Sequence, residues 1–299
     1  MLSEKESKSA WIWTPESGRW INPQYSIKET PQEQYEWAMR ILELGEYNQA
    51  IKQFKRLIKK FPQSPYAPKS QYAIGLAYER QGKIRKAIEE YHKVAESYPY
   101  SPVVSDVIEA EYRLGNILLT REGGDTWQKI TTYEGNYELA GQVFEQTIKI
   151  SPFGPRAPEM QYKSGEAYFK AKKYEEAITK YKKVLDNYRE SEWVDEAIFK
   201  VGLSAEVKSL DTPRDQTQTE EAIKWFSEYL KKYPKGDKAK EVKERLDNLL
   251  DKKARKIYET GEYYEKRGEK ESALIYYRRL LREFPETSWA DKSRVKLNE

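Results

Sequence analysis

Apolar residues recur at helical spacing through residues 159–189, and the pattern is interrupted once by a short polar stretch. After Lys172 and Lys173 the apolar positions follow one face of a helix, at Ala177, Ile178, Tyr181 and Val184. Before that stretch the small residue Gly165 stands where two helices would have to approach closely. The segment therefore predicts two amphipathic helices joined at Lys172 and Lys173, which we term the first and second helix of a unit.

The same unit recurs six times. An alanine near the start of each second helix is followed four residues later by an aromatic residue, in the pairs Ala50/Phe54, Ala87/Tyr91, Ala140/Phe144, Ala177/Tyr181, Ala222/Phe226 and Ala273/Tyr277. Each first helix carries a small residue: Ala38, Gly75, Gly115, Gly165, Gly202 and Gly261. Five of the six second helices are followed by a proline, which lacks an amide donor and ends the helix. We expect each aromatic ring to fill the space beside the small residue.

This combination is the signature of the tetratricopeptide repeat. It predicts an all-α fold, a right-handed superhelix of about six helix pairs over residues 31–299, in which each pair packs mainly on its neighbours. Departures from the repeat length predict insertions near residues 122–134 and 209–219. Residues 238–266 predict one unusually long helix or two helices that adjoin.

Two helix starts can be predicted from local sequence. Thr30, Pro31 and Glu33 have the order of an N-cap, a first helical residue and the third residue of a capping box. After the second insertion, Thr219 stands before two glutamates and is expected to cap the next helix.

Residues 1–30 are expected to form an extended N-terminal segment. Trp11, Trp13 and Trp20 flank a predicted turn at residues 15–18, and the alternating pattern on either side predicts a short hairpin or a hooked extended segment. These tryptophans either cap the open end of the repeats or form an exposed anchor for a partner, because clustered tryptophans favour interfaces.

Composition narrows the possible functions. Charged residues make up 34 % of the 299 residues, and the mean hydropathy is −0.95, as expected for a thin molecule with a large surface. The net charge of +4 comes without a long basic run, so nucleic acid is not an expected partner. The chain has no cysteine, which excludes disulfides and zinc–thiolate sites, and no run approaches eighteen apolar residues.

Catalytic chemistry is not expected. His92 is the only histidine, so a catalytic Ser-His-Asp or Cys-His arrangement is not expected. Gly123 and Gly124 lack the lysine and threonine of a phosphate-binding loop and are read as an ordinary loop. The sequence predicts no enzyme, no cofactor and no metal.

An aromatic residue stands three positions before each small residue of the first helices: Tyr35, Tyr72, Tyr112, Tyr162, Phe199 and Tyr258. We place these six at the fifth position of the first helices, which line the concave face of such superhelices. They are therefore candidates for a peptide-binding groove. The alternative is that each ring packs between adjacent first helices, and both can hold because a tyrosine can bury its ring edge and present its hydroxyl.

Three further segments resemble the BamD family of outer-membrane lipoproteins, which belong to the β-barrel assembly machinery. They are P-R-D-Q-T-Q-T at 213–219, E-Y-Y-E-K-R-G at 262–268 and S-P-F-G-P at 151–155. The resemblance runs from about residue 32 to the end. Two features differ: members have five repeats, and they begin with a signal peptide and a lipidated cysteine that are absent here.

The resemblance implies a non-catalytic scaffold on the periplasmic face of the outer membrane, where membrane contact would require the missing lipid anchor. The implied partners are a BamA-like barrel protein, other subunits of the assembly complex and unfolded outer-membrane protein segments. Docking of the barrel protein is expected at Tyr263, Tyr264 and Arg267. For Arg267 the alternative is a cation that only caps a helix C-terminus. The alternative function is a general tetratricopeptide adaptor of the cell envelope or cytoplasm.

Overall fold

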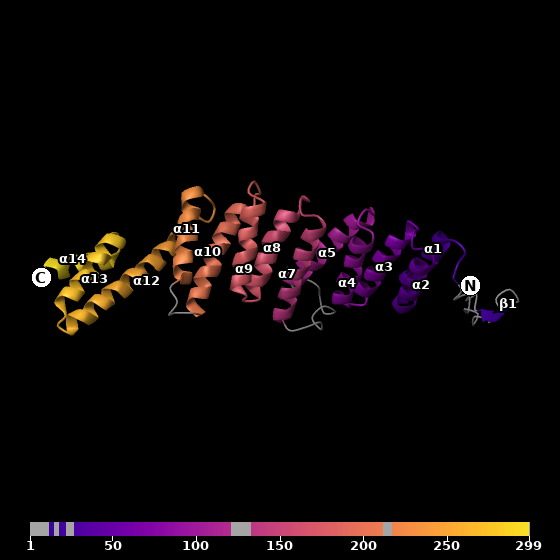
Figure 1. The fold of residues 1–299 in the computed structure, drawn as a ribbon, viewed down its shortest axis with the longest axis horizontal. Helices are drawn as coiled ribbons and strands as arrows, with labels where there is room; N and C mark the ends of the chain where they lie inside the picture. Colours follow the sequence, from indigo (N-terminus) through magenta and orange to yellow (C-terminus); the bar gives the residue numbers. More distant parts are fainter. Residues whose placement is uncertain (1–11, 15–17, 22–26, 121–132, 212–216, 299) are drawn as a thin grey trace, which may run out of the picture. The chain divides into compact units, whose positions relative to one another are not determined.

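The computed structural model describes residues 12–14, 18–21, 27–120, 133–211 and 217–298. These residues form two compact units, Met1–Ile150 and Ser151–Glu299. Within the described residues, twelve helices follow one another as six pairs and a thirteenth helix comes after them (Figure 1), so the predicted all-α tetratricopeptide fold is confirmed.

The first unit begins with a two-stranded antiparallel hairpin of β1 (Ile12–Thr14) and β2 (Arg19–Ile21), in which Trp13 pairs with Trp20. Trp11 lies outside the described residues. Three helix pairs follow: α1 (Pro31–Glu43) with α2 (Tyr47–Lys60), α3 (Tyr66–Arg80) with α4 (Ile84–Ser97), and α5 (Val103–Thr120) with α7 (Tyr133–Ile150). The predicted capping box at the start of α1 is present, because Thr30 Oγ1 accepts from the Glu33 amide at 3.2 Å and Glu33 Oε2 accepts from the Thr30 amide at 3.4 Å.

The second unit contains the other three pairs. They are α8 (Ala157–Lys170) with α9 (Tyr174–Asn187), α10 (Val194–Asp211) with α11 (Thr217–Lys232), and α12 (Ala239–Lys266) with α13 (Lys270–Glu283). A further helix, α14 (Ser288–Asn298), packs on the last pair and was not predicted separately. Trp289 of α14 lies 31 positions after Tyr258, the same offset as Trp193 from Tyr162, so α14 corresponds to the first helix of a seventh, half repeat.

The predicted contact between the small residue of the first helix and the aromatic ring of the second helix is present in the helix pairs. A Cβ atom built on Gly75 would lie 2.5 Å from Tyr91, and on Gly165 it would lie 2.6 Å from Tyr181. The same close approach occurs at Gly115, Gly202 and Gly261, with 2.7, 2.6 and 2.6 Å. No real Cβ is tolerated at such distances, so these rings occupy the space that a side chain would need.

The two insertions differ in outcome. The one near residues 122–134 falls almost wholly on residues 121–132, outside the described residues. In the one near 209–219 the described residues are helical, because α10 continues to Asp211 and α11 begins at Thr217. Thr219 is therefore inside α11, and the prediction that it caps this helix is wrong: the helix starts two residues earlier.

The turn inside a pair closes with one residue in the left-handed region. This residue is Gly45, Gly82 and Gly268 in three repeats, and Lys172, with φ 59°, in the fourth. The predicted turn at Lys172 and Lys173 is thus present between α8 and α9.

A buried polar residue directly precedes four of the aromatic residues proposed for the groove: Gln34, Gln71, Glu111 and Gln161. The three glutamines donate to the carbonyl of the residue before the second-helix aromatic, namely Gln53, Glu90 and Lys180, at 3.2, 3.0 and 3.0 Å. The carboxylate of Glu111 cannot donate when ionised. In that repeat Thr147 Oγ1 lies 2.8 Å from both Glu111 Oε2 and the Val143 carbonyl.

Candidate partner-binding surfaces

The six aromatic residues proposed for the groove all contact the ring that fills the space beside the small residue of their own repeat. The ring centroids are separated by 5.9 Å for Tyr35–Phe54, 5.0 Å for Tyr72–Tyr91, 6.4 Å for Tyr112–Phe144, 5.4 Å for Tyr162–Tyr181, 6.3 Å for Phe199–Phe226 and 5.4 Å for Tyr258–Tyr277. Counted from the helix starts, only Tyr35 is at the fifth position, because the other first helices begin further upstream. All six rings therefore have a packing role.

Exposure divides the six into two groups. Tyr35, Tyr72 and Tyr112 in the first unit are half-buried. Tyr162, Phe199 and Tyr258 in the second unit are buried, with 7, 3 and 8 % of their surface exposed. Only the first group keeps enough accessible ring to contact a ligand without rearrangement of the repeats.

A second ring closes over several of these aromatics. Tyr162 lies 4.9 Å from Trp193, and Tyr258 lies 5.4 Å from Trp289. Tyr35 lies 5.4 Å from Tyr66, the first residue of α3. The sequence reasoning missed these covering residues, although their constant offset of 31 positions was a usable signal.

A polar cluster adjoins Tyr72. Tyr91 donates from its hydroxyl to Glu79 Oε2 at 2.7 Å, and Arg113 of α5 donates to both oxygens of Glu79, at 2.6 and 2.9 Å. Burial, Asp106 and Glu79 together raise the pKa of Tyr72, and burial raises that of Tyr35. Their hydroxyls stay protonated at neutral pH and can donate hydrogen bonds.

The residues predicted for docking lie together at the end of α12. Arg267 is the C-cap of the helix; its Nη1 donates to the Tyr263 hydroxyl at 3.0 Å and its Nε to Glu269 Oε1 at 3.1 Å. Tyr264 stacks on Tyr276 of α13 with centroids 5.4 Å apart. Tyr263 and Arg267 are exposed, whereas Tyr264 is partly packed.

Backbone bonds alone close this helix end. The Gly268 amide donates to the Glu265 carbonyl at 2.9 Å, and the Glu269 amide donates to the Tyr264 carbonyl at 3.0 Å. Gly268 has φ 77°, so it supplies the left-handed residue of a Schellman motif. The Arg267 side chain is not needed for this geometry.

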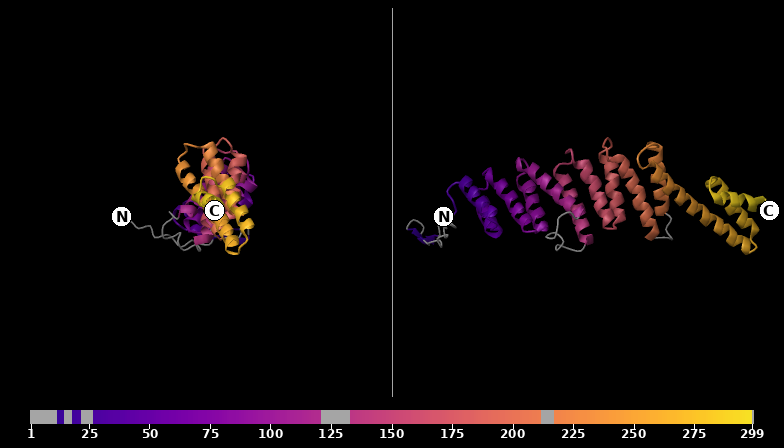
Figure 2. Two further views of the ribbon diagram at one scale, coloured as in Figure 1. Left: turned by 90° about the vertical axis from the view of Figure 1, so that its left-hand side faces the viewer. Right: turned by 180° about the vertical axis from the view of Figure 1, so that it is seen from behind.

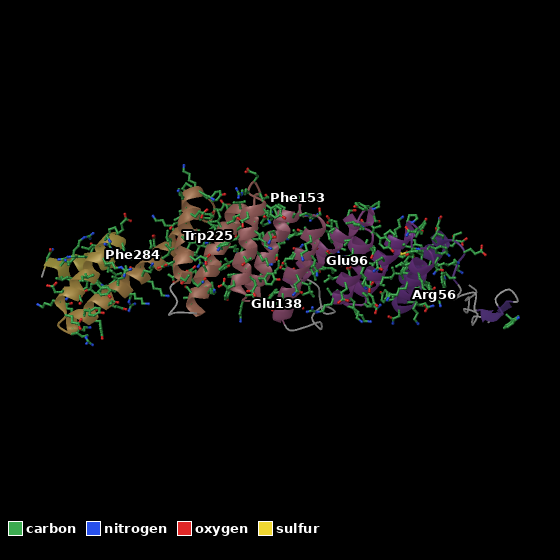
Figure 3. The ribbon with its side chains drawn as sticks, viewed as in Figure 1. Arg56, Glu96, Glu138, Phe153, Trp225 and Phe284 are labelled. Atoms are coloured by element: carbon green, nitrogen blue, oxygen red, sulfur yellow. The ribbon has the colours of Figure 1, made fainter. Side chains whose placement is uncertain are left out.

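Two aromatic side chains missed by the sequence reasoning are almost wholly exposed. Tyr100, in the turn before α5, is 99 % exposed and borders a surface pocket of about 630 Å³ lined mainly by prolines and tyrosines. Phe153, labelled in Figure 3, is 94 % exposed in the turn before α8. It belongs to the S-P-F-G-P segment at 151–155.

The described residues contain no group of three or more acidic or histidine side chains placed to hold a metal ion. Across the same residues, no helix combines the length and the apolar character needed to span a bilayer.

The chain matches one protein-family model and one curated protein. A family model described as YfiO, outer membrane lipoprotein, matches residues 27–118 and 128–298. The outer membrane protein assembly factor BamD of Caulobacter vibrioides is 22 % identical over 165 residues, which are 55 % of this chain and 54 % of that protein. The chain thus spans about half the length of this curated relative.

Solved structures with a similar fold are more distant. The C-terminal part of a tetratricopeptide protein of Cytophaga hutchinsonii is 17 % identical, with 88 % of this chain and 87 % of that chain covered and a TM-score of 0.36. TTC0263 of Thermus thermophilus is 18 % identical, with 74 % and 99 % covered and a TM-score of 0.33. Similarities this low carry no argument about function. The family match is what identifies the chain, because it extends over most of the repeats: the protein belongs to the YfiO family of outer membrane lipoproteins.

Proposed function

We propose that this protein is a non-catalytic scaffold of the outer-membrane β-barrel assembly machinery, held at the periplasmic face of the outer membrane. The observation that carries the proposal is the family match over residues 27–118 and 128–298, together with the tetratricopeptide fold. Its partners are a BamA-like barrel protein, other subunits of that complex and unfolded outer-membrane protein segments.

Unfolded segments bind at the half-buried tyrosines of the first unit, Tyr35, Tyr72 and Tyr112. A half-buried ring offers a face for stacking, which tolerates varied sequence, while a protonated hydroxyl donates to a peptide carbonyl. Strands of outer-membrane barrels alternate apolar and polar residues and are rich in aromatics at the membrane interfaces, so their segments suit such a surface. Tyr162, Phe199 and Tyr258 contribute by fixing the helix pairs, because their rings are buried.

The test is crosslinking of a barrel-derived C-terminal peptide to the whole chain. Replacing Tyr72 and Tyr112 together by alanine should weaken crosslinking, because flat aromatic contacts add about 0.5–1.5 kcal/mol each beyond area burial. The matched control is the double replacement of Tyr188 and Tyr233 by alanine, two half-buried tyrosines of the second unit that precede inter-repeat turns. Circular dichroism melting monitors the fold of both variants.

If crosslinking of the Tyr72 and Tyr112 variant equals that of the control while its fold is intact, these tyrosines are not the binding surface. Because each ring also packs on a core ring, a second pair, Tyr72→Phe with Tyr112→Phe, keeps the packing and removes only the hydroxyls. Failure of the chain to co-purify with a BamA-like protein would favour a general adaptor of the cell envelope.

A further inference from the structure

The helix α12 departs from the repeat geometry. It has 28 residues, whereas the other first helices have 13 to 18. Val242 and Leu249, in its first part, belong to the core of the fifth pair, and Tyr258, further on, belongs to the core of the sixth. Figures 1 and 2 show α12 running from beside α11 to beside α13. The stretch between Leu249 and Tyr258 therefore carries the chain from one core to the next.

A small surface pocket of about 160 Å³ lies at this point, between α11, α12 and α13. Its wall contains three cationic side chains, Lys253 and Lys256 of α12 and Arg279 of α13, against the single carboxylate of Glu220 from α11. Tyr276 also lines it. Glu283, which pairs with Arg279, adds a second carboxylate beside this wall, so three cationic side chains meet two carboxylates around a space sized for a small group.

The cations of the pocket are incompletely neutralised. Lys253 Nζ lies 3.2 Å from Glu220 Oε1, and only 23 % of the lysine side chain is exposed. Its ammonium also lies 6.0 Å from the ring centroid of Phe284, which is labelled in Figure 3. Arg279 uses Nε to contact both oxygens of Glu283 at 3.0 Å, and within the described residues the Lys256 ammonium has no acceptor.

The sequence around the pocket also carries a net positive charge. Residues 252–299 contain thirteen lysines and arginines against nine acidic residues, an excess of four that equals the net charge of the whole chain. The rest of the chain is thus balanced, and the positive field is concentrated around the last helices. Such a field attracts anions before any contact forms.

We infer that this pocket binds a phosphate group. A phosphate monoester carries about −1.5 to −2 charge near pH 7 and three acceptor oxygens, one for each of the three cationic side chains. A carboxylate offers only two oxygens to the three cationic side chains. The inference does not depend on the proposed assembly function.

The test is a titration of the whole chain with inorganic phosphate, monitored by backbone amide shifts at constant ionic strength. Lys256→Gln combined with Arg279→Gln should weaken binding about tenfold, which corresponds to 1.4 kcal/mol. The matched control is Lys252→Gln combined with Arg282→Gln, which removes the same charge from exposed positions on the same two helices outside the pocket. It should change the affinity less than twofold.

Equal weakening in both variants would overturn the inference, because it would indicate general attraction to a basic surface. Absence of phosphate-dependent shifts in α12 and α13 would overturn it as well, and so would binding there of an aspartate-rich peptide but not of phosphate. The source of the phosphate is separated by sedimentation with vesicles. Pocket-dependent binding to phosphatidic acid, but not to phosphatidylcholine, assigns a lipid headgroup; phosphate binding without vesicle binding assigns a soluble phosphate.

Discussion

At the residue scale, the glycines of the first helices are fixed by the rings that face them. Gly165 is the clearest case, because an added Cβ would lie 2.6 Å from Tyr181, which is itself fully buried. Alanine gains about 1 kcal/mol of helix propensity over glycine, whereas overpacking a core costs about 1–3 kcal/mol. We expect Gly165→Ala to lower the free energy of unfolding by up to about 2 kcal/mol in urea titrations.

A smaller side chain in place of Tyr181 should relieve the same steric overlap. Combining Gly165→Ala with Tyr181→Leu should cost less than the sum of the two single changes, because the methyl group then has space. Additive losses would show that steric overlap with the ring is not the reason for glycine at this position.

A second residue-scale prediction concerns His92 and the buried Glu111. Their atoms Nδ1 and Oε1 lie 3.7 Å apart, and neither has a hydrogen-bond partner among the residues that the structure describes. Glu96, labelled in Figure 3, lies 3.8 Å from His92 Nε2, and Lys149 of α7 acts in the opposite sense. The interaction with the nearby Glu111 carboxylate is the largest cause that raises the pKa of His92 above its usual 6.5, and burial opposes it.

A raised pKa in the folded state means that the charged histidine stabilises the fold below about pH 6.5, the value expected when unfolded. This contribution is lost as pH rises through the raised value. We therefore expect the stability of the chain to fall as the pH rises above about 6.5, and His92→Gln to abolish most of this change. Urea titrations at several pH values measure it. A slope that is the same in the variant would assign the pH dependence to other groups.

At the element scale, the geometry of the turn between α12 and α13 makes it possible to distinguish a structural role of Arg267 from a docking role. The bonds that close α12 are made by the backbone of Gly268 and Glu269, and exposed ion pairs contribute little, about 0–1 kcal/mol. Arg267→Leu should therefore melt within a few degrees of the parent protein, while co-purification of the BamA-like partner is lost.

The companion variant is Arg267→Lys. A planar guanidinium binds a partner carboxylate through two hydrogen bonds, and an ammonium does not reproduce this geometry. We expect Arg267→Lys to weaken docking too, although it preserves the charge at the helix end. Lower melting with unchanged docking in Arg267→Leu would leave the arginine only a structural role.

At the scale of the whole molecule, family membership leads to a cellular prediction. In cells that express the protein from its own gene, we expect it to fractionate with the outer membrane and to face the periplasm. Membrane flotation with protease accessibility of intact and permeabilised cells measures both. Recovery in the cytoplasmic fraction would contradict the assembly proposal and favour the general adaptor.

Much of the candidate site could be located from sequence, but its accessibility could not. The positions of the six aromatics proposed for the groove follow from the small residue three positions later, and in the structure each ring packs on the second-helix aromatic of its own repeat. The six are Tyr35, Tyr72, Tyr112, Tyr162, Phe199 and Tyr258. Which rings remain accessible depends on neighbours. Trp193 and Trp289 cover Tyr162 and Tyr258, and these contacts form only when the next helix docks.

The sequence by itself determined the repeat: where helices pair, which glycines are required, and where each pair ends. These features depend on side-chain size and backbone chemistry within one unit of about forty residues, so they can be read locally. Only the tertiary structure decided what happens between units. The half repeat of α14, the burial of Glu111 beside His92 and the cationic pocket beside α12 each arise from residues separated in sequence. Their chemistry depends on solvent exclusion and on distances that the pattern along the chain does not contain.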